Sequence, residues 1–357
     1  MKVLHICETA RGGVGTYIDT LIELERDTVT SKVILPDAHQ EMVSALCNTS
    51  VFRYPGRSAG SILRLLGVGL REKFAFQPDI VFCHSSLSLL ALCLLRLVSW
   101  RTRFIYCAHG WAGAREMPDG AKARIVRKVE GLLAGLADRV VNVSFAEMDH
   151  AQRHGYGGRQ IVIENAVRPT RGVPPATVFG TESDLIHLLF VGRHDHQKGL
   201  DILLAAFVKA HRLRPDLRLH VVGESVQSKN TQAIPIAGVD FLGWVSSDQI
   251  DGYYRSADLL VVPSRWEGFG LVIPEALRNG TPVLVSDRSF LPDLITQGVT
   301  GLASPLGVDE FAAALVALNK TALCAMRASC FTLFRARFHS ARLGHKMKAL
   351  YADVVAQ

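Results

Sequence analysis

The feature that most constrains the fold of this chain is an alternation of two apolar patterns. Short runs rich in Val and Ile, such as KVLHIC (2–7), alternate with longer segments, such as TYIDTLIELERD (16–27), whose apolar residues recur at helical spacing. Parallel strands need a crossover, usually a helix, between one strand and the next. The alternation therefore predicts βαβ units on parallel sheets, in the α/β class.

One segment interrupts the alternation. Residues 167–184 (VRPTRGVPPATVFGTESD) are rich in Pro, Gly and Arg and follow neither pattern, which is typical of a linker. Strand and helix patterns resume with LIHLLFVGR (185–193) and continue to TPVLVSD (281–287). A chain of 357 residues is also long for a single core. We therefore expect two α/β halves, with a ligand cleft between them.

The composition narrows the class of partner and the compartment. The formal charge of +7 favours anionic partners, which are nucleic acids, acidic lipids or phosphorylated small molecules. Seven cysteines with no CxxC or Cys/His metal spacing are typical of reduced cysteines in a cytoplasmic protein. The N-terminal strand runs into glycines before any signal-peptide region, and the apolar run 87–100 is too short to span a bilayer. We expect a cytoplasmic protein.

A glycine-rich turn follows the first predicted strand. Gly12, Gly13 and Gly15 precede a helix, so backbone N–H groups there can approach a phosphate or a sugar. The spacing matches neither the dinucleotide motif GxGxxG nor a Walker loop, and an ordinary strand-to-helix turn explains it equally well.

A basic loop, VGRHDHQKGLD (191–201), follows the first strand of the second half. Arg193 and Lys198 at the carboxyl end of a strand are suited to a pyrophosphate, which needs charge neutralisation and hydrogen-bond donors. A solvated basic turn is the alternative. His194, Asp195 and His196 do not make a convincing metal site.

Two glutamates lie in the otherwise apolar segment VVPSRWEGFGLVIPEALRNGTPVLVSD (261–287). Pro274 and Glu275 fall in the first turn of a predicted helix that Gly280 ends. Glu275 has a structural explanation, because an acidic residue there complements the helix dipole. Glu267 lies in a loop at the carboxyl end of a strand, where α/β sheets bind ligands.

These segments together resemble the family 4 retaining glycosyltransferases. The family signature, two glutamates separated by seven residues, is EGFGLVIPE here, and GRHDHQKG, NGTPVLVSD, GGVGTYIDTLIEL and CAHGW resemble further family blocks. The resemblance is strong over 188–315 and looser before it. It implies the GT-B fold, with two Rossmann-like domains whose parallel sheets face a central cleft. The expected domains are an acceptor-side domain (1–170), a donor domain (171–340) and a C-terminal helix (341–357) near the first domain.

The resemblance also implies residue roles on the donor. Arg193 and Lys198 would hold the donor diphosphate and neutralise the charge of the leaving group. Glu275 would accept hydrogen bonds from the ribose hydroxyls, and Glu267 would face the hydroxyls of the donor sugar. Neither glutamate would be a nucleophile. The implied reaction needs no metal and no cofactor.

Further contacts are implied for the backbone and for the first half. Gly13 and Gly15 would let the N-terminal loop close over the diphosphate and the acceptor. His109, after a predicted strand, would lie near the transferred sugar, although it is also explained as a structural histidine. Sugar or phosphate contacts would come from the amides of Phe269, Gly270 and Leu271.

A membrane contact is one of two interpretations of GSILRLLGVGLREKF (60–74). Apolar residues recur at helical spacing, and the surrounding cations would form a positive patch on the acceptor side: Arg53, Arg57, Arg64, Arg71 and Lys73. An ordinary half-buried helix with a solvated face is as good an explanation.

The leading hypothesis is a retaining glycosyltransferase that uses a nucleoside-diphosphate sugar and a glycan or lipid-linked acceptor. The pathway would be exopolysaccharide, capsule or lipopolysaccharide assembly at the cytosolic face of the inner membrane. The alternatives are another GT-B enzyme, such as an epimerase or a phosphorylase, and a non-catalytic sugar-nucleotide-binding subunit. Nucleic-acid binding would explain the charge but not the paired glutamates.

Overall fold

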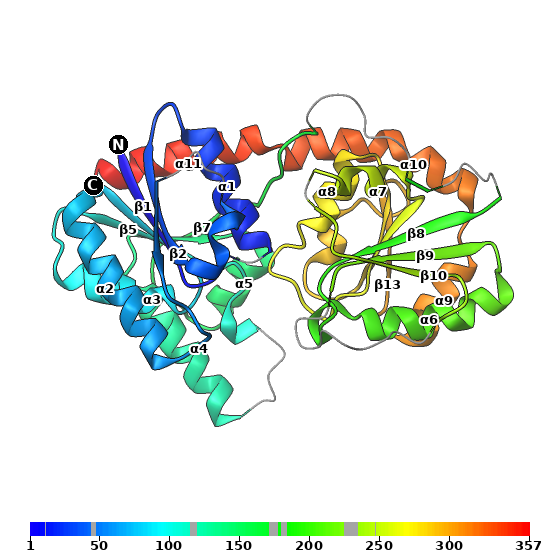
Figure 1. The fold of residues 1–357 in the computed structure, drawn as a ribbon, viewed down its shortest axis with the longest axis horizontal. Coiled ribbons are helices and arrows are strands. Elements are labelled where there is room, and N and C mark those ends of the chain that lie inside the picture. The colour runs from blue at the N-terminus through cyan, green and yellow to red at the C-terminus, as the bar shows by residue number, and fades with distance from the viewer. Residues whose placement is uncertain are drawn as a thin grey trace. The chain divides into compact units, whose positions relative to one another are not determined.

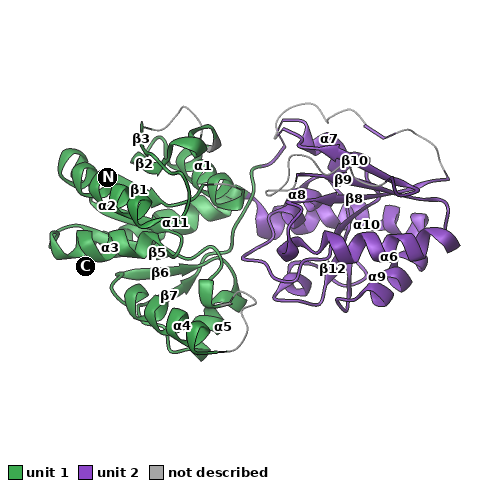
Figure 2. Ribbon diagram, turned by 60° about the horizontal axis from the view of Figure 1, so that its bottom comes forward, with its two compact units in different colours: residues 1–168, 340–357 green, residues 169–339 purple. Residues whose placement is uncertain are grey.

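The structure is a computed structural model of the chain, and it describes residues 1–10, 12–43, 48–114, 120–170, 178–179, 184–224, 235–246 and 248–357. The chain forms two compact units, which Figure 2 colours separately: unit 1 comprises Met1–Arg168 and Ser340–Gln357, and unit 2 comprises Pro169–His339. Most of the predicted linker, residues 167–184, lies outside the described residues.

Unit 1 contains a parallel sheet of seven strands in the order β3-β2-β1-β4-β5-β6-β7. The strands are β1 (Lys2–Cys7), β2 (Thr30–Pro36), β3 (Asn48–Phe52), β4 (Ile80–His84), β5 (Arg103–Cys107), β6 (Arg139–Asn142) and β7 (Gln160–Val162). Every residue of β4 and β6 is buried, as expected for strands covered on both faces.

The helices of unit 1 cover both faces of this sheet. They are α1 (Gly13–Glu25), α2 (Ala59–Phe76), α3 (Ser88–Leu97), α4 (Ala121–Ala134), α5 (Phe145–Arg153) and α11 (Ser340–Val355), with short 3-10 helices η1 (Asp37–Met42) and η2 (Ala112–Ala114). Figure 1 shows α1 beside α11 on one side of the sheet and α2, α3 and α4 on the other. The apolar residues that predicted the strands and helices form the core between these layers.

Unit 2 contains a parallel sheet of six strands in the order β10-β9-β8-β11-β12-β13. The strands are β8 (Ile186–Val191), β9 (Leu217–Val222), β10 (Val239–Gly243), β11 (Leu259–Val262), β12 (Val283–Ser286) and β13 (Gly301–Ser304). The helical segments are η3 (His196–Lys198), α6 (Leu200–Leu213), α7 (Ile250–Ser256), α8 (Val272–Arg278), η4 (Leu291–Leu294), α9 (Val308–Val316), α10 (Lys320–Leu333) and the π-helical turn η5 (Phe334–Phe338).

Each sheet reverses its strand order at one point. In unit 1 the order reverses between β1 and β4, and in unit 2 between β8 and β11. The loops that leave neighbouring strands there run in opposite directions, which leaves a crevice at the carboxyl ends where open α/β sheets bind ligands. The candidate site residues of each unit are therefore expected near these two points.

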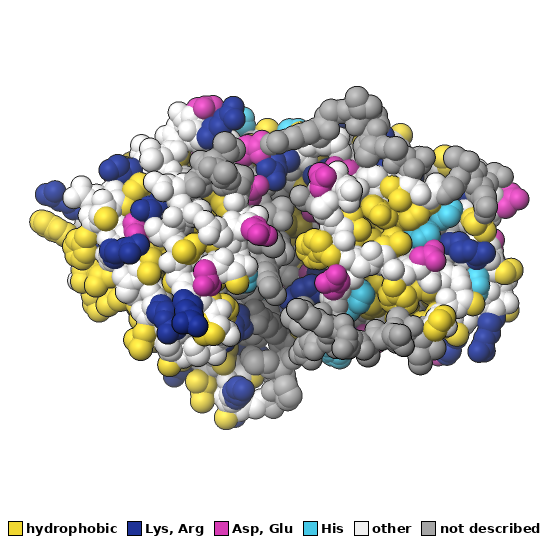
Figure 3. All heavy atoms as spheres, in the orientation of Figure 1, with side chains coloured by type: hydrophobic (Ala, Val, Ile, Leu, Met, Phe, Trp, Pro, Cys, Tyr) yellow, Lys and Arg dark blue, Asp and Glu magenta, His cyan; other side chains and the backbone are white. Residues whose placement is uncertain are grey.

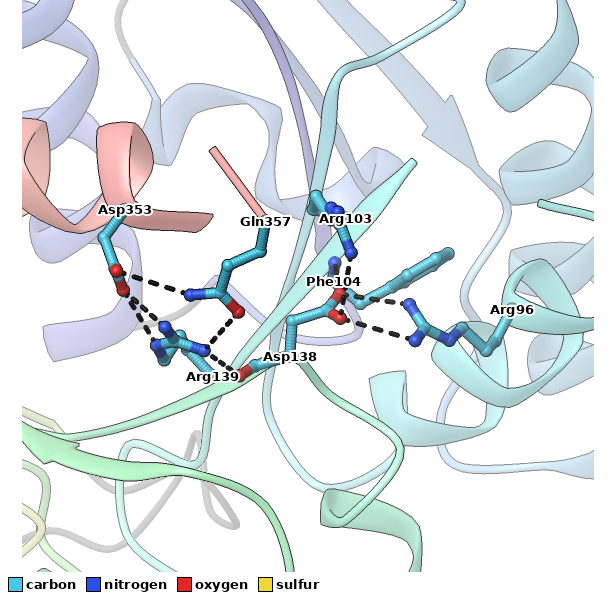
Figure 4. A network of polar contacts seen from close by, with 7 residues as sticks. All are labelled: Arg96, Arg103, Phe104, Asp138, Arg139, Asp353 and Gln357. Carbon is cyan, nitrogen blue, oxygen red and sulfur yellow. Dashed lines mark hydrogen bonds and ion pairs between the residues drawn. The ribbon is translucent and has the colours of Figure 1, made fainter. Parts of the chain in front are cut away.

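The last helix, α11, belongs to unit 1 although it follows unit 2 in the chain. Asp353 of α11 accepts hydrogen bonds from Arg139 of β6, whose guanidinium also contacts Gln357 (Figure 4). On α1, Tyr17 donates to the Met347 sulfur. These contacts fasten the end of the chain to the sheet of unit 1. The structure begins this helix at Ser340, one residue before the predicted start at residue 341.

No single helix in the described part of the chain is long and apolar enough to cross a membrane, and one bent pair, α9 with the continuous segment of α10 and η5, meets the criteria of length and composition. The predicted apolar run 87–100 forms α3 and the turn after it.

Candidate functional site

The basic loop of unit 2 is held against the end of β11 by Gly199. This residue has a φ of 68°, and a Cβ atom there would lie 2.0 Å from the carbonyl oxygen of Pro263. Only glycine permits both the left-handed conformation and the close approach. The turn is fixed further because the Asp195 side chain accepts a hydrogen bond from the Lys198 amide. The loop after β8 thus runs alongside the loop after β11, at the point where the strand order reverses.

This approach brings Lys198 and Glu267 together. The Lys198 Nζ lies 2.6 Å from Glu267 Oε1, and the two side chains are 17% and 5% exposed. The Ser264 hydroxyl donates to the same carboxylate oxygen. Two predicted site residues from loops 69 positions apart therefore form one partly buried ion pair. Within this pair the two charges offset each other, and Ser264 supplies a second hydrogen bond to the carboxylate.

Arg193 lies on the same loop but makes different contacts. Its guanidinium contacts Asp195 and Gln197 of its own loop, and its side chain is 51% exposed. Gln197 in turn donates to the carbonyl oxygen of Trp266, next to Glu267. Arg193 is therefore an accessible cation close in sequence to Lys198, rather than a member of the Lys198–Glu267 pair.

Glu275 lies in the first turn of α8, as predicted, and Gly280 follows the end of the helix with a φ of 73°. The buried Tyr254 of α7 donates a hydrogen bond of 2.9 Å to its carboxylate. Burial raises the pKa of Glu275, and nearby Arg278 and the Tyr254 hydrogen bond oppose that rise. Tyr254 was not identified from the sequence, because no motif marks a tyrosine on a separate helix.

The segment between the two glutamates presents its backbone. The Phe269 side chain is buried against Phe290 and Phe338, and Gly270 has a φ of 79°. Within the described part of the chain, the amides of Phe269, Gly270 and Leu271 donate no hydrogen bond. These three amides thus keep their donor capacity for a ligand, whereas the Phe269 ring belongs to the core.

In unit 1, the glycines after β1 begin α1. Gly13 is the first residue of the helix and is exposed, and Gly15 is buried one half-turn later. The N-cap residue, Gly12, has a φ of 70° and offers no side chain to the first amides of the helix. Arg11 lies outside the described residues.

His109 follows β5 in a strained backbone conformation. Its φ is +50°, which is uncommon for a residue other than glycine, and Gly110 continues the turn at +103°. The Tyr17 ring of α1 contacts the His109 ring edge-on, with centroids 4.6 Å apart. Strained residues persist where the surrounding structure fixes them, and they cluster at functional sites.

Two buried glutamates fix the loop that carries His109. The Glu130 carboxylate of α4 accepts hydrogen bonds from the amides of Ala112 and Gly113. Glu147 of α5 accepts from the amide of Val143, and burial raises the pKa of its carboxyl to about 8. Glu130 thus holds the loop after β5 through Ala112 and Gly113, and Glu147 holds it through a backbone hydrogen bond from Gly110.

His109 is also one end of a chain of three histidines that sequence reasoning missed. His84 Nδ1 lies 3.0 Å from His109 Nε2, and His84 Nε2 lies 3.0 Å from His5 Nδ1. Burial lowers the pKa of His5 and of His109 to about 3. Burial and the two neighbouring histidines hold the pKa of His84 well below its ordinary value. The signal for His84 was present, since it ends the strand IVFCH much as His109 follows RFIYC. His5 in mid-strand gave none.

The structure thus gathers the predicted residues in two groups. Lys198, Glu267 and the amides of 269–271 lie at the strand reversal of unit 2, and Glu275 is nearby on α8. Gly13, Gly15 and His109 lie around the strand reversal of unit 1. Among the described residues, no group of three His, Cys, Asp or Glu side chains could hold a metal ion.

Two protein-family models match this chain. Residues 178–324 match the model of glycosyl transferases group 1, and residues 11–171 match that of glycosyltransferase family 4. An uncharacterized 41.2 kDa protein in the cps region of Klebsiella pneumoniae is 30% identical over 312 residues, which cover 85% of each chain.

Solved structures share the fold. Sucrose-phosphate synthase from Thermosynechococcus elongatus has a TM-score of 0.84 at 18% identity, with all of both chains covered. The Anabaena protein HepE, solved in complex with UDP-glucose, has a TM-score of 0.77 at 19% identity, with 99% of this chain and 100% of that chain covered. The GT-B fold predicted from the sequence is confirmed by these neighbours.

Proposed function

Because the chain belongs to the glycosyl transferases group 1, in glycosyltransferase family 4, and is a glycosyltransferase, we propose that it is a retaining enzyme. Its donor is a nucleoside-diphosphate sugar, and its acceptor is a glycan or a lipid-linked glycan. The observation that carries this proposal is the Lys198–Glu267 ion pair at the strand reversal of unit 2. A cation for a phosphate and a carboxylate for sugar hydroxyls are what this proposal needs side by side, and the two side chains lie 2.6 Å apart.

The donor would replace the partner of Lys198. A diphosphate oxygen draws the ammonium toward the phosphate, while Arg193, which is half-exposed, supplies a second cation. Glu267, freed from Lys198 but still hydrogen-bonded to Ser264, accepts hydrogen bonds from the sugar hydroxyls. Glu275 accepts from the ribose hydroxyls, and the unused amides of residues 269–271 contact sugar or phosphate oxygens.

In this proposal the enzyme accelerates the reaction by stabilising the leaving group. The bond between the anomeric carbon and the phosphate oxygen breaks, and negative charge develops on the diphosphate beside Lys198 and Arg193. The released phosphate oxygen takes the proton of the acceptor hydroxyl, whose oxygen bonds to the anomeric carbon on the same face. Configuration is retained without a protein nucleophile, and the reaction needs no metal or cofactor.

The pathway we propose is capsule, exopolysaccharide or lipopolysaccharide assembly. Support comes from the relative in the cps region of Klebsiella pneumoniae. The complex of HepE with UDP-glucose makes a UDP-hexose the first donor to test.

We also propose a cytoplasmic location with peripheral contact to an anionic membrane. Large apolar side chains are exposed on α2 to α4, including Leu63, Leu97, Trp100 and Leu132. Figure 3 shows hydrophobic and basic side chains interleaved over this part of unit 1. Two of the five cations predicted from the sequence have acidic partners, since Arg57 contacts Glu8 and Arg71 contacts Glu72. The contact would thus rest as much on apolar side chains as on charge.

The test is a thermal-shift screen of the purified protein against UDP-, GDP- and ADP-sugars, because a ligand that binds the native state raises its melting temperature. We expect one nucleotide class to raise it, and expect Lys198→Ala and Glu267→Ala each to weaken binding at least about tenfold, from the loss of a charged hydrogen bond. Lys209→Ala removes a cation from the exposed Lys209–Asp309 pair and is the matched control.

Product analysis with a labelled donor then separates the alternatives. Transfer or hydrolysis with retained configuration supports the proposal. An altered sugar on the nucleotide indicates an epimerase, phosphate-dependent release indicates a phosphorylase, and binding without turnover indicates a non-catalytic subunit. If no nucleotide sugar binds, or if both substitutions leave donor affinity unchanged, the proposal is wrong.

A further inference from the structure

The three histidines of unit 1 form a directional hydrogen-bond chain. Their rings come from the middle of β1, the end of β4 and the loop after β5, and successive ring centroids lie 5.3 Å apart. A neutral imidazole carries one N–H donor and one acceptor nitrogen. With two links of 3.0 Å, the protons can therefore be arranged in only two ways. Either each ring donates toward His109, or each ring donates toward His5.

The surroundings keep the three rings neutral. The groups that face them are the Phe82 ring of β4, the buried thiols of Cys7 and Cys107 on neighbouring strands, and Tyr17 of α1. Behind these groups lies α11, whose Met347 accepts from Tyr17 and whose Tyr351 lies edge-on to Phe82. Tyr351 is also hydrogen-bonded to Glu25, whose pKa burial raises to about 8. Among the described residues, no carboxylate is recorded in hydrogen-bond or ion-pair contact with the rings. Nothing there would offset a positive charge.

The two ends of the chain differ. His5 Nε2 is fully buried and has no partner among the described residues. His109 is partly exposed, and its Nδ1 has no recorded partner in the described part of the chain. A proton on His5 Nε2 would be a buried N–H without an acceptor, and such donors are rarer in proteins than buried acceptors left without a donor. At His109 Nδ1, solvent or substrate satisfies either form.

We propose that His5 and His84 are positioning residues that hold His109 as the neutral tautomer protonated on Nδ1. His5 Nδ1–H donates to His84 Nε2, and His84 Nδ1–H donates to His109 Nε2. His109 then presents a fixed N–H at the strand reversal of unit 1. Resting on the function proposed above, this N–H is a donor to a hydroxyl oxygen of the transferred sugar, and it stays a donor from about pH 5 to 8.

Nitrogen-15 NMR of the full chain, labelled at the histidine rings, tests the tautomer directly. Protonated and unprotonated ring nitrogens have well-separated shifts, and His109→Gln assigns the signals of His109. We expect a protonated His109 Nδ1, an unprotonated His109 Nε2 and an unprotonated His5 Nε2, unchanged between pH 8 and 5. A His109 that carries its proton on Nε2, mixes both tautomers or titrates near pH 6.5 overturns the proposal.

Two variants of nearly equal size test the role of His84. His84→Asn keeps an N–H that can donate to His109 Nε2, and His84→Leu offers neither a donor nor an acceptor. We expect the first to preserve the Nδ1–H tautomer and the second to leave His109 in a mixture of both tautomers, with kcat lower by on the order of tenfold from one lost hydrogen bond. If both variants leave the tautomer unchanged, His84 does not control it. Should His84→Leu not fold, wild type and His84→Asn still decide.

The outcome is separable from the function proposed above. The tautomer is read from the ligand-free protein and does not depend on turnover. Nucleotide-sugar binding is read from the melting temperature. If the tautomer is as expected and no nucleotide sugar binds, the role of the histidines stands and the proposed donor is wrong. If a nucleotide sugar binds and the tautomer differs, the proposed donor stands and the role of the histidines is wrong.

Discussion

At the scale of single residues, the site of unit 2 depends on what small residues allow rather than on the charged residues alone. Lys198 and Glu267 meet because Gly199 lets the loop after β8 approach the backbone of Pro263. The resemblance identified the charged pair, but not the glycine that brings them together. His5 shows the same limit, because its partner ring lies on a neighbouring strand and nothing in its own strand marks it.

Gly199→Ala should destabilise the protein by more than the cost of placing an alanine in the left-handed backbone conformation. The new Cβ would lie 2.0 Å from a backbone oxygen, so a steric cost adds to the cost of a left-handed alanine, for a total of about 2 kcal/mol or more. Gly243→Ala is the matched control, because Gly243 has the same φ of 68° and nothing within 4 Å of its Cβ position. Urea unfolding of both variants measures the difference. Equal losses of unfolding free energy in the two variants would show that the close approach of residue 199 to the Pro263 carbonyl does not affect stability.

At the scale of secondary structure, α5 combines a capped N-terminus with a buried glutamate. Ser144 caps the helix by accepting from the Glu147 amide, and Glu147 reaches back to the Val143 amide. The motif SFAE could be recognised from the sequence as a capping box. The burial of its glutamate could not, because burial is set by the loop after β5 that packs over it.

Glu147→Gln should make stability less dependent on pH. Because the pKa of Glu147 is raised, the folded state keeps this proton at pH values where the unfolded state has lost it. The contribution of Glu147 to the free energy of unfolding is therefore fully present below the ordinary pKa of a glutamate and is lost as the pH rises toward about 8. The slope is at most about 1.4 kcal/mol per pH unit.

Urea unfolding of wild type and Glu147→Gln at pH 5.5 and 7.5 measures this effect. The free energy of unfolding of the variant should rise relative to that of wild type as the pH rises. The comparison removes the contribution of the histidines, because both proteins share it. Glu25, whose pKa is also raised to about 8, should leave a residual slope in the variant. Parallel pH profiles for the two proteins would contradict the assignment.

At the scale of the whole molecule, the surface of unit 1 over α2 to α4 is unusual for its exposed apolar side chains. Leu97 and Trp100 at the end of α3 are 84% and 90% exposed, and Arg101 lies over the Trp100 ring. Exposed apolar groups with adjacent cations are typical of surfaces that rest on anionic membranes.

The protein should therefore sediment with vesicles that contain anionic lipid and not with neutral vesicles, and added salt should weaken the binding. Leu97→Ser with Trp100→Ser should reduce binding severalfold. Leu213→Ser, at an exposed position of unit 2, should leave it unchanged and is the control. Binding that ignores both lipid charge and the double substitution would exclude this surface as the contact.

The sequence by itself determined the class of fold and the family. Apolar periodicity is a local property, so strands such as KVLHIC and helices such as that after Gly13 could be predicted, and the spacing of Glu267 and Glu275 with the basic loop specified the family. Nothing in those patterns encodes distance between separate strands.

Only the tertiary structure decided which residues act as partners. It paired Lys198 with Glu267 and Tyr254 with Glu275, placed the Phe269 ring in the core, and lined up His5 of β1, His84 of β4 and His109 after β5. Parallel strands that are neighbours in space are separated by whole helices in sequence. The register between them, which sets these contacts, is therefore fixed by packing and not by local pattern.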